Sequence, residues 1–462
     1  MYEDTIVAIA TPPGEGGLAV VRLSGREALA LANAIFRPLR PGPLRPFRLR
    51  YGQIVDPATQ QRVDEALIAF MRAPRSFTRE DVVELSLHGG IMPAQTTLRL
   101  CLAAGARLAR PGEFTLRAFL NGRIDLSQAE ATLDVMRAQT EAALTLAQAQ
   151  LGGWLAQEVR AARSALLAAL AYLTVMVDFP EDEVAAEDIG PALHHGLATV
   201  TKLLQSADQG LLYRQGARLA LVGRPNVGKS SLLNALLRSN RAIVTPIPGT
   251  TRDTLEERAN LTGIPVVLTD TAGIHASPDP VERLGIERTH AALAQADLAL
   301  FVLDATSPLT PDDHAIAQLI GAKPCIVVWN KVDGAEVQPA SPPLASPPLA
   351  SPPPVSAPPQ FISARTGQGL EPLVAAITQT LLGGVPPAAD SAHLVSNPRH
   401  QDALRRAQAY LGAALEGYKA KHPLDLLAGD LTAALNALGE ITGETVGEDL
   451  LEVIFSRFCI GK

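Results

Sequence analysis

A glycine-rich segment near the middle of the chain, Gly223-Arg-Pro-Asn-Val-Gly-Lys-Ser230, constrains the fold more than any other feature. A strand-like run, Arg218–Val222, precedes it, and a helix-like stretch, Ser231–Leu237, follows it. In this context the pattern G-x-x-x-x-G-K-S binds nucleotide phosphates: backbone N–H groups surround them, Lys229 brings a charge to the β and γ oxygens, and the Ser230 hydroxyl can ligate Mg²⁺. The sequence therefore predicts a P-loop α/β domain.

Three further segments follow in the order found in GTPases. They are Gly249-Thr-Thr-Arg-Asp253, Asp270-Thr-Ala-Gly273 after the apolar run 264–268, and Asn330-Lys-Val-Asp333 after the run 325–329. A P-loop pattern alone can be an ordinary glycine-rich turn before a helix, but four ordered segments indicate a GTP-binding domain.

Each of these segments has its own physical task. Thr251 can offer oxygens to Mg²⁺ and the γ-phosphate, which predicts a loop ordered only while that phosphate is present. Asp270 is suited to hold the metal through a water, and Gly273 lets a backbone N–H approach the γ-phosphate. Asp333 can accept hydrogen bonds from the guanine N1 and N2 donors, a pair that adenine lacks. Ser363-Ala-Arg365 fits the loop that backs the guanine from its other side.

The predicted site thus comprises the P-loop, the loops around the γ-phosphate and the base-reading loops. Lys229 and Thr251 are the predicted catalytic residues among them, and Ser230 and Thr251 are the predicted Mg²⁺ ligands. The predicted GTP contacts are Asn226, Val227, Gly228, Lys229, Ser230, Ser231, Thr245, Pro246, Ile247, Pro248, Gly249, Thr250, Thr251, Asp270, Thr271, Ala272, Gly273, Asn330, Lys331, Asp333, Ser363, Ala364 and Arg365.

Length and composition limit the remaining possibilities. A chain of 462 residues predicts about three domains of ordinary size. The net charge of −7 argues against a protein that coats nucleic acid non-specifically, so any RNA contact is expected to be local. Three widely separated cysteines fit a reducing compartment better than a disulfide framework. The acidic N-terminus is not typical of a secretory signal. The apolar stretch Ala165–Val177 is expected to be a buried helix that is too short to span a bilayer. We therefore expect a cytoplasmic protein without a membrane partner.

The organisation predicted is multidomain, with the G domain inserted into helical sequence. Residues 1–120 read as an α+β domain, because short β-like runs alternate with Gly/Pro turns and two helices. Residues 121–215 and 385–462 read as two parts of one all-α helical domain, separated by a P-loop α/β G domain at 216–384. A Pro/Ser-rich run, 338–360, is expected to be a disordered insertion, since it cannot build a packed core.

With these parts in place, the chain closely resembles the MnmE (TrmE) family of tRNA-modification GTPases over nearly its whole length. The resemblance rests on the G motifs and on ordered matches outside them. These are Asp4–Ala8 with Thr11–Gly14, Phe77-Thr78 with Glu80-Asp81, His88–Gly90, Ala109–Phe114, Phe119–Asn121 with Asp125-Leu126 and Gln128–Glu130, Asp178–Glu181 and the terminal Phe458-Cys-Ile-Gly-Lys462.

The family resemblance implies a homodimeric, K⁺-activated GTPase that works with the flavoprotein MnmG. Its N-terminal α+β domain would bind 5-formyl- or 5,10-methylene-tetrahydrofolate and carry the dimer contact. Together the two proteins would add an aminomethyl or carboxymethylaminomethyl group to C5 of the wobble uridine of certain tRNAs. GTP hydrolysis would drive conformational change and would not itself transfer the one-carbon unit.

The residue that orients the attacking water must differ from that in Ras-like proteins, because Ile274 follows Asp270–Gly273 where those proteins keep a glutamine. The resemblance assigns this task to Glu282. By spacing alone, Glu282 also fits a solvated carboxylate in the first turn of a helix, where the helix dipole favours it.

The resemblance also implies a K⁺ site formed by Asn226 and by carbonyls of Thr245, Ile247 and Thr250. A K⁺ ion there would supply the positive charge that an arginine finger supplies elsewhere. Asn226 is otherwise an ordinary turn residue. Pro246 replaces an acidic residue common in this loop, but proline leaves the neighbouring carbonyls free, so we expect K⁺ binding to survive.

For folate, the resemblance points to Arg22, Glu84, Arg123 and Lys462. A carboxylate can accept paired hydrogen bonds from a pterin, and cations suit the glutamyl tail. Arg123 stands where the family commonly has lysine, which keeps the charge and changes the geometry. Without the family resemblance, we would interpret such isolated charges as surface ion pairs.

Cys459 is expected in a helix tail near the C-terminus, with Phe455, Phe458 and Ile460. A buried small hydrophobe is the ordinary role of a free cysteine, whereas the family motif favours a catalytic or site-shaping role.

Two other functions share part of this evidence. A ribosome-assembly or signalling GTPase with partner-binding flanks has the same G motifs, but it usually carries a second G domain or a basic RNA-binding module, and neither is visible here. A general NTPase motor is disfavoured by Asp333.

Overall fold

The computed structural model describes residues 4–179, 185, 187–240, 256–270, 290–334, 356–386 and 392–461. These residues form two compact units, one of residues 1–133 with 435–462 and the other of residues 134–434. Helices α4 (Leu126–Arg137) and α14 (Leu424–Thr442) each run across the division.

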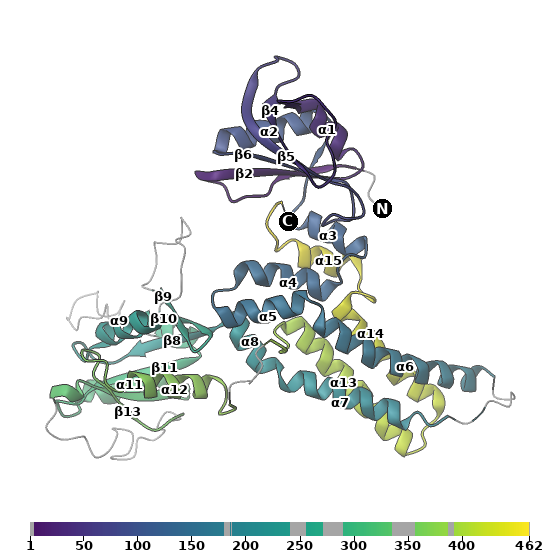
Figure 1. The fold of residues 1–462 in the computed structure, drawn as a ribbon. Coiled ribbons are helices and arrows are strands. Elements are labelled where there is room, and N and C mark those ends of the chain that lie inside the picture. Colours follow the sequence, from purple (N-terminus) through teal and green to yellow (C-terminus); the bar gives the residue numbers. More distant parts are fainter. Residues whose placement is uncertain are drawn as a thin grey trace. The chain divides into compact units, whose positions relative to one another are not determined.

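The first unit contains a seven-stranded sheet in the order β3-β4-β5-β6-β2-β1-β7 (Figure 1). All its neighbouring strands are antiparallel except β1 and β7. Helices α1 (Ala28–Ile35) and α2 (Ile91–Ala103) cover one face, where their apolar side chains join a shared core with those of the sheet. The strands are β1 Ile6–Ile9, β2 Gly16–Ser24, β3 Phe36–Pro38, β4 Leu49–Val55, β5 Arg62–Met71, β6 Val82–Gly89 and β7 Arg107–Leu108.

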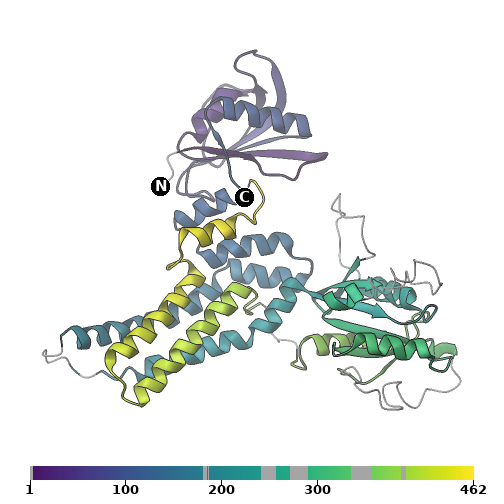
Figure 2. The same cartoon turned by 180° about the vertical axis from the view of Figure 1, so that it is seen from behind.

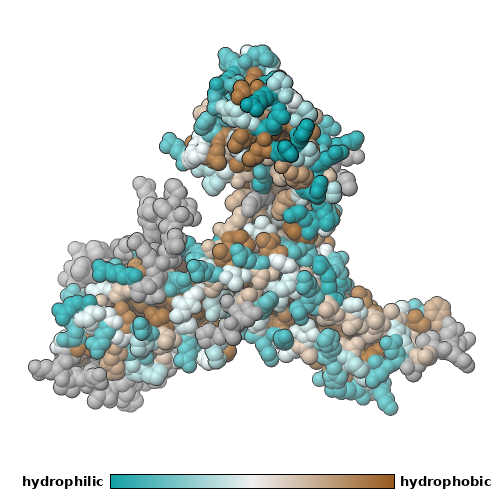
Figure 3. All heavy atoms as spheres, viewed as in Figure 1, coloured by the Kyte–Doolittle hydropathy of each residue, from teal (hydrophilic) through white to brown (hydrophobic). Residues whose placement is uncertain are grey.

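Among the described residues, α3 (Glu113–Leu120) covers one end of the other face of this sheet. Phe114 of α3 packs there on Ile6 and Ala8 of β1. Farther along the same face, Leu49, Tyr51 and Leu67 remain exposed, and Leu18 of β2 is 64% exposed. The space-filling view shows apolar side chains gathered on this unit (Figure 3). Apolar patches of this kind mark interaction surfaces.

The C-terminal segment of the chain is part of this first unit. Helix α15 (Glu448–Phe455) packs with the start of α4 in an apolar cluster that includes Leu126, Phe455 and Phe458. A Cβ at Gly112 would lie 2.6 Å from the Phe455 carbonyl oxygen, so only glycine allows α3 and α15 to approach this closely.

The second unit contains a six-stranded sheet in the order β13-β12-β11-β8-β10-β9, parallel except for β9. Its central strands are buried on both faces, as parallel strands between helices are. Helices α9 (Lys229–Asn240) and α12 (Leu370–Leu381) pack on one face, and α11 (Pro311–Ile320) packs on the other (Figures 1 and 2). The strands are β8 Ala217–Val222, β9 Glu256–Leu261, β10 Ile264–Asp270, β11 Leu298–Asp304, β12 Cys325–Asn330 and β13 Gln360–Phe361.

The helices before and after this α/β domain lie side by side. Helix α7 packs along α13, where the Gln408 amide donates a hydrogen bond to Thr201 Oγ1 at 2.9 Å (Figure 1). The buried Gln150 accepts from Ser396 Oγ across a separation of 246 residues. The helices are α5 Glu141–Leu151, α6 Trp154–Asp178, α7 Gly190–Gln205, α8 Ala207–Gln215 and α13 Pro398–Lys419.

Two expectations about this unit are wrong in part. The apolar stretch 165–177 belongs to α6, which has 25 residues and is long and apolar enough by composition to cross a membrane, and only 28% of its most apolar window is buried. Buried residues follow one stripe, including Val159, Leu166 and Leu173, because a surface helix buries one face. The end of the predicted insertion, 356–360, is placed: the Ser356 N–H donates to the Cys325 carbonyl at 2.9 Å, and Gln360 starts β13. Residues 338–355 lie outside the described residues.

A buried arginine holds the first unit together where β1, α3 and the 76–81 loop meet. Arg117 is fully buried, and its guanidinium contacts the carboxylates of Asp4 at 2.6 Å, Glu80 at 3.2 Å and Glu113 at 3.1 Å. Hydrogen bonds from the Arg107 and Arg117 guanidinium groups hold the pKa of Glu113 below its ordinary value, against burial, which raises it. Arg117 thus joins carboxylates from three segments of the chain through one buried guanidinium.

Arg117→Met is predicted to destabilise the first unit by about 3–5 kcal/mol, because three carboxylates lose a buried partner. The measurement is hydrogen–deuterium exchange of amides in β1 and β2 of the full chain. Arg62→Met is the matched control: Arg62 also pairs with a carboxylate, Glu65, but is exposed, so its loss should cost less than about 1 kcal/mol. Equal exchange in the two variants would contradict the prediction.

Candidate functional site

The P-loop follows the C-terminal end of β8 and runs into the first turn of α9. Asn226 and Gly228 both have left-handed backbone conformations, with φ of 66° and 97°. The Lys229 ammonium donates hydrogen bonds to the carbonyls of Gly223 at 2.6 Å and Arg224 at 2.9 Å. Burial lowers the pKa of Lys229, and the nearby charge of Asp270 opposes that shift. The loop thus holds a cation at the N-terminus of a helix, which is where phosphate binds.

A hydroxyl and a carboxylate meet beside this lysine. Ser230 Oγ donates a hydrogen bond to Asp270 Oδ2 at 2.8 Å, and Asp270 is the last residue of β10. The ends of β8 and β10 are adjacent because the two strands are parallel neighbours. Hydroxyl and carboxylate oxygens are the ligands that Mg²⁺ takes beside nucleotide phosphates, so the donor set fits this ion.

The buried amide of Asn330 joins the P-loop to the base-reading loops. Its Nδ2 donates to the Val227 carbonyl at 2.9 Å, and its Oδ1 accepts from the Ala364 N–H at 3.0 Å. A Cβ at Gly228 would lie 2.2 Å from Asn330 Nδ2, so the P-loop needs glycine there. The three loops are thus held at one edge of the sheet, as parallel strands require.

The carboxylate expected to read guanine is held in its ionised form. Asp333 Oδ1 accepts a hydrogen bond from Ser363 Oγ at 2.6 Å, and Asp333 also pairs with the Arg365 guanidinium. The Ser363 hydroxyl and, less strongly, the charge of Arg365 hold the pKa of Asp333 below its ordinary value. An ionised carboxylate only accepts hydrogen bonds, which matches the donors of guanine N1 and N2.

The structure therefore brings together the P-loop, Asp270 and the two base loops. Ser231 lies exposed in the first turn of α9. Several predicted residues lie outside the described residues: Thr245, Pro246, Ile247, Pro248, Gly249, Thr250, Thr251, Thr271, Ala272, Gly273, Glu282 and Lys462.

Sequence reasoning missed two residues of this site. Asp304, at the C-terminal end of β11, pairs with Lys331 Nζ at 2.6 Å. Arg224 of the P-loop contacts Ser307 Oγ in the loop that follows β11. The signal for Asp304 was present in the sequence, since a carboxylate ends an apolar run between two G motifs. Nothing in the sequence pairs Arg224 with Ser307.

Three of the four residues expected to contact folate lie together in the first unit. Arg22 of β2 and Glu84 of β6 are cross-strand partners, with Nε and Oε1 2.8 Å apart. The Arg22 guanidinium lies over the Phe114 ring and that of Arg123 over the Phe77 ring, with 5.7 and 5.8 Å to the ring centroids. Phe77 packs on the cluster that contains Phe114. Two cations and one carboxylate thus border a single aromatic cluster.

Cys459 lies near these residues but not in a helix, so that expectation is wrong. Helix α15 ends at Phe455, and the chain continues without helical structure to Gly461, whose φ is 98°. The Gly461 carbonyl accepts a hydrogen bond from the Arg22 guanidinium at 3.1 Å. Cys459 is exposed, so its thiol is accessible to solvent.

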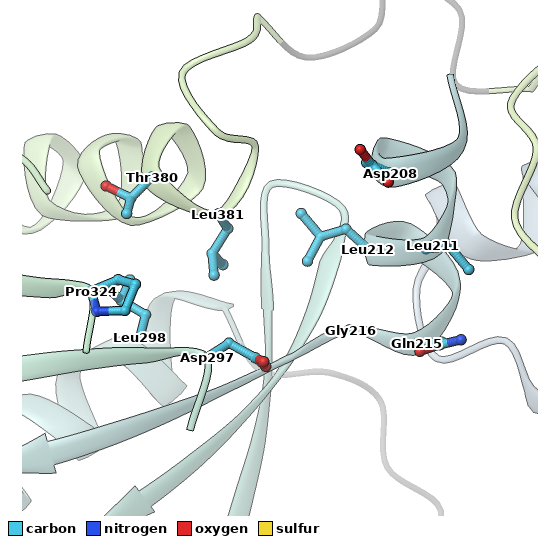
Figure 4. Close-up of a pocket in the computed structure, with 10 residues that line it drawn as sticks. All are labelled: Asp208, Leu211, Leu212, Gln215, Gly216, Asp297, Leu298, Pro324, Thr380 and Leu381. Atoms are coloured by element: carbon cyan, nitrogen blue, oxygen red, sulfur yellow. The ribbon is translucent and has the colours of Figure 1, made fainter. Parts of the chain in front are cut away.

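The second unit also contains a cavity of about 320 Å³ at the other end of its sheet. Leu298, at the start of β11, and Pro324, just before β12, line it together with Leu212, Leu381, Asp208 and Asp297 (Figure 4). The G motifs lie at the opposite, C-terminal ends of these strands. This cavity is therefore not the nucleotide site.

Comparison with known proteins decides the family. The TrmE N-terminal family matches residues 5–123, and the MnmE helical-domain family matches residues 126–459. The chain belongs to the MnmE family of tRNA-modification GTPases. It is 62% identical to the tRNA modification GTPase MnmE of Chloroflexus aurantiacus, over 99% of this chain and all of that one. It is 57% identical to the MnmE of Roseiflexus castenholzii over the full length of both.

The solved structure of Era from Aquifex aeolicus bound to GDP·AlF4⁻ is similar to part of this chain. The two sequences are 31% identical, the match covers 42% of this chain and 66% of that one, and the TM-score is 0.27. As a member of the MnmE family, the chain is a multidomain GTPase with a TrmE N-terminal domain and an MnmE helical domain.

Asp333→Asn is predicted to weaken GTP binding roughly a hundredfold, because two charge-assisted hydrogen bonds to guanine are lost. The amide can donate to the C2 carbonyl of xanthine, so xanthosine triphosphate should now bind better than GTP. Calorimetric titration with both nucleotides measures this change. Asp312→Asn is the control, since it makes the same substitution at an exposed carboxylate on α11 that is not a predicted GTP contact. Unchanged GTP affinity in the Asp333 variant would refute base reading by this residue.

Proposed function

We propose that this GTPase acts with a flavoprotein of the MnmG type on the wobble uridine of certain tRNAs. It would help to add an aminomethyl or carboxymethylaminomethyl group at C5, with the carbon coming from 5-formyl- or 5,10-methylene-tetrahydrofolate. The observation that carries this proposal is the match to a tRNA modification GTPase over 99% of the chain. We further propose that it works in the cytoplasm, which agrees with three free cysteines.

The hydrolysis proposed is Mg²⁺-dependent and K⁺-activated. Lys229, Ser230, Thr251 and Asp270 would position GTP and Mg²⁺, and Glu282 would orient the attacking water. A K⁺ ion bound by Asn226 and by the carbonyls of Thr245, Ile247 and Thr250 would supply further positive charge toward the phosphates. Asn226 is exposed in a left-handed turn of the P-loop, so its side chain is accessible to an ion.

The one-carbon donor is proposed to bind beside the Phe77–Phe114 cluster. Glu84 would accept hydrogen bonds from the pterin, and Arg22, Arg123 and Lys462 would attract the glutamyl carboxylates. Cys459 would shape this site or take part in the chemistry. The partial exposure of the Arg22 and Glu84 side chains, 21% and 30%, supports access by a ligand.

A homodimer is proposed through the open face of the first unit's sheet. Leu18, Leu49, Tyr51 and Leu67 expose apolar surface on adjacent strands, next to the Arg22–Glu84 pair. A second copy of the chain would remove this surface from water.

The function is tested with the purified full chain, an MnmG flavoprotein, unmodified tRNA, GTP and methylene-tetrahydrofolate, in buffers that contain K⁺ or Na⁺. We expect hydrolysis to be at least tenfold faster in K⁺ than in Na⁺. The larger K⁺ ion would fit the proposed carbonyl ligands, and its charge would stabilise the negative charge that develops on the phosphates. We also expect modified wobble uridine in nucleoside digests from the K⁺ reactions. Asn226→Ala should lose most of the K⁺ effect while it still binds GDP.

Each arm of this experiment can fail independently. Equal hydrolysis rates in the two salts would refute K⁺ activation. Normal hydrolysis without modified nucleosides would refute the tRNA function and leave the GTPase unaffected.

Glu84→Gln is predicted to weaken 5-formyl-tetrahydrofolate binding by about tenfold to a hundredfold, since a neutral amide cannot accept both pterin hydrogen bonds. Calorimetry on the full chain measures the affinity. Glu65→Gln is the matched control, because Glu65 lies on β5 in the same unit and, like Glu84, is partly exposed. An affinity equal to that of the control would remove Glu84 from the site.

A further inference from the structure

The turn that carries the guanine-reading carboxylate depends on an unusual backbone conformation. Lys331 follows the end of β12 with a φ of 68°, in the left-handed region that side-chain-bearing residues rarely adopt. It leads directly into the short 3₁₀ turn η1 (Val332–Gly334), which contains Asp333. Such conformations persist only where surrounding contacts hold them. The position of Asp333 therefore depends on what holds Lys331.

Backbone hydrogen bonds of Val332 and Gly334 hold part of this turn, and Asp304 contacts the Lys331 side chain. Its Oδ2 lies 2.6 Å from Lys331 Nζ, and its Oδ1 accepts hydrogen bonds from the N–H of Thr306 at 2.9 Å and from the Thr306 hydroxyl at 2.6 Å. The Asp304 side chain is only 12% exposed. Hydrogen bonds from Lys331 and Thr306 keep the pKa of Asp304 below its ordinary value, against burial, which raises it. The carboxylate thus presents a fixed negative charge to the lysine.

The loop that carries this carboxylate is anchored at both ends. The Ala305 N–H donates to the Asn330 carbonyl at 2.8 Å, next to Lys331. Farther along, Arg224 of the P-loop contacts Ser307 Oγ, and its Nε lies 3.6 Å from the buried carboxylate of Asp313. One segment, residues 304–313, therefore contacts both the base-reading loop and the P-loop.

We propose that Asp304 is a positioning residue for guanine nucleotides, which acts by holding Lys331 and so fixes the turn that presents Asp333. Asp304 contacts neither the predicted metal ligands nor the phosphate lysine among the described residues. Its loss should therefore weaken nucleotide binding and leave the hydrolytic step unchanged. Because the effect passes through Lys331, it should disappear when Lys331 is already altered.

The test measures release of a fluorescent (mant) GDP from the full chain by stopped flow. Asp304→Asn is expected to release GDP about fivefold to tenfold faster, with a higher KM for GTP and an unchanged kcat. Thr306→Val, which removes one hydrogen bond to the same carboxylate at an exposed position, should give a twofold to threefold increase. Asp312→Asn is the matched control: it removes the same charge from an exposed neighbour on α11 and should match the wild type.

A double-mutant cycle with Lys331→Gln separates positioning from a general loss of structure. If Asp304 acts through Lys331, the double variant should release GDP no faster than Lys331→Gln alone. Additive rates, or an Asp304→Asn rate equal to that of Asp312→Asn, would overturn the proposal. If Asp304→Asn fails to fold, a wild-type release rate in Thr306→Val overturns it equally.

Discussion

The amide of Asn330 is the interaction on which the nucleotide site depends. It is 2% exposed and bonds to Val227 in the P-loop and to Ala364 in the second base loop. A buried amide with satisfied partners on two loops fixes their separation, and losing one partner would leave a polar group unpaired. The same contact explains Gly228, because no side chain fits between the P-loop and this amide. The phosphate-binding loop and the base-reading loops are thus held in a fixed arrangement by one side chain.

The sequence predicts that these loops lie together because nucleotide binding requires fixed residue types in the segments that follow buried strands. Asp270 ends the buried strand β10, and Lys229 and Asp333 lie in the segments that follow β8 and β12; parallel strands bring such ends to one edge. The contacts that hold these residues were not predictable in the same way. Asp304 and Lys331 are 27 residues apart, and only the register of β11 beside β12 brings them together.

The first unit shows where sequence patterns fail. Strand β4 is difficult to predict from the sequence, because its large apolar residues Leu49 and Tyr51 are exposed whereas Gly52 is buried. Gly52 is required because a Cβ there would lie 2.4 Å from the Phe36 ring. The role of Arg117 could not be predicted either, since an arginine at helical spacing normally reads as a solvated residue. One of its partners in the buried site, Asp4, is 113 residues away in the sequence.

The apolar character of α6 was misread because alanine-rich helices can pack closely without being buried all round. A Cβ on Gly196 of α7 would lie 2.9 Å from the Leu166 side chain, so α6 and α7 approach each other where one of them lacks a side chain. Two helices that approach closely make many weak dispersion contacts and need few large side chains between them. This agrees with the aromatic content of 4%. Leu167 and Val175 on the same helix remain exposed. At the contact of Gly196 with Leu166, a small residue allows the close packing of α6 on α7.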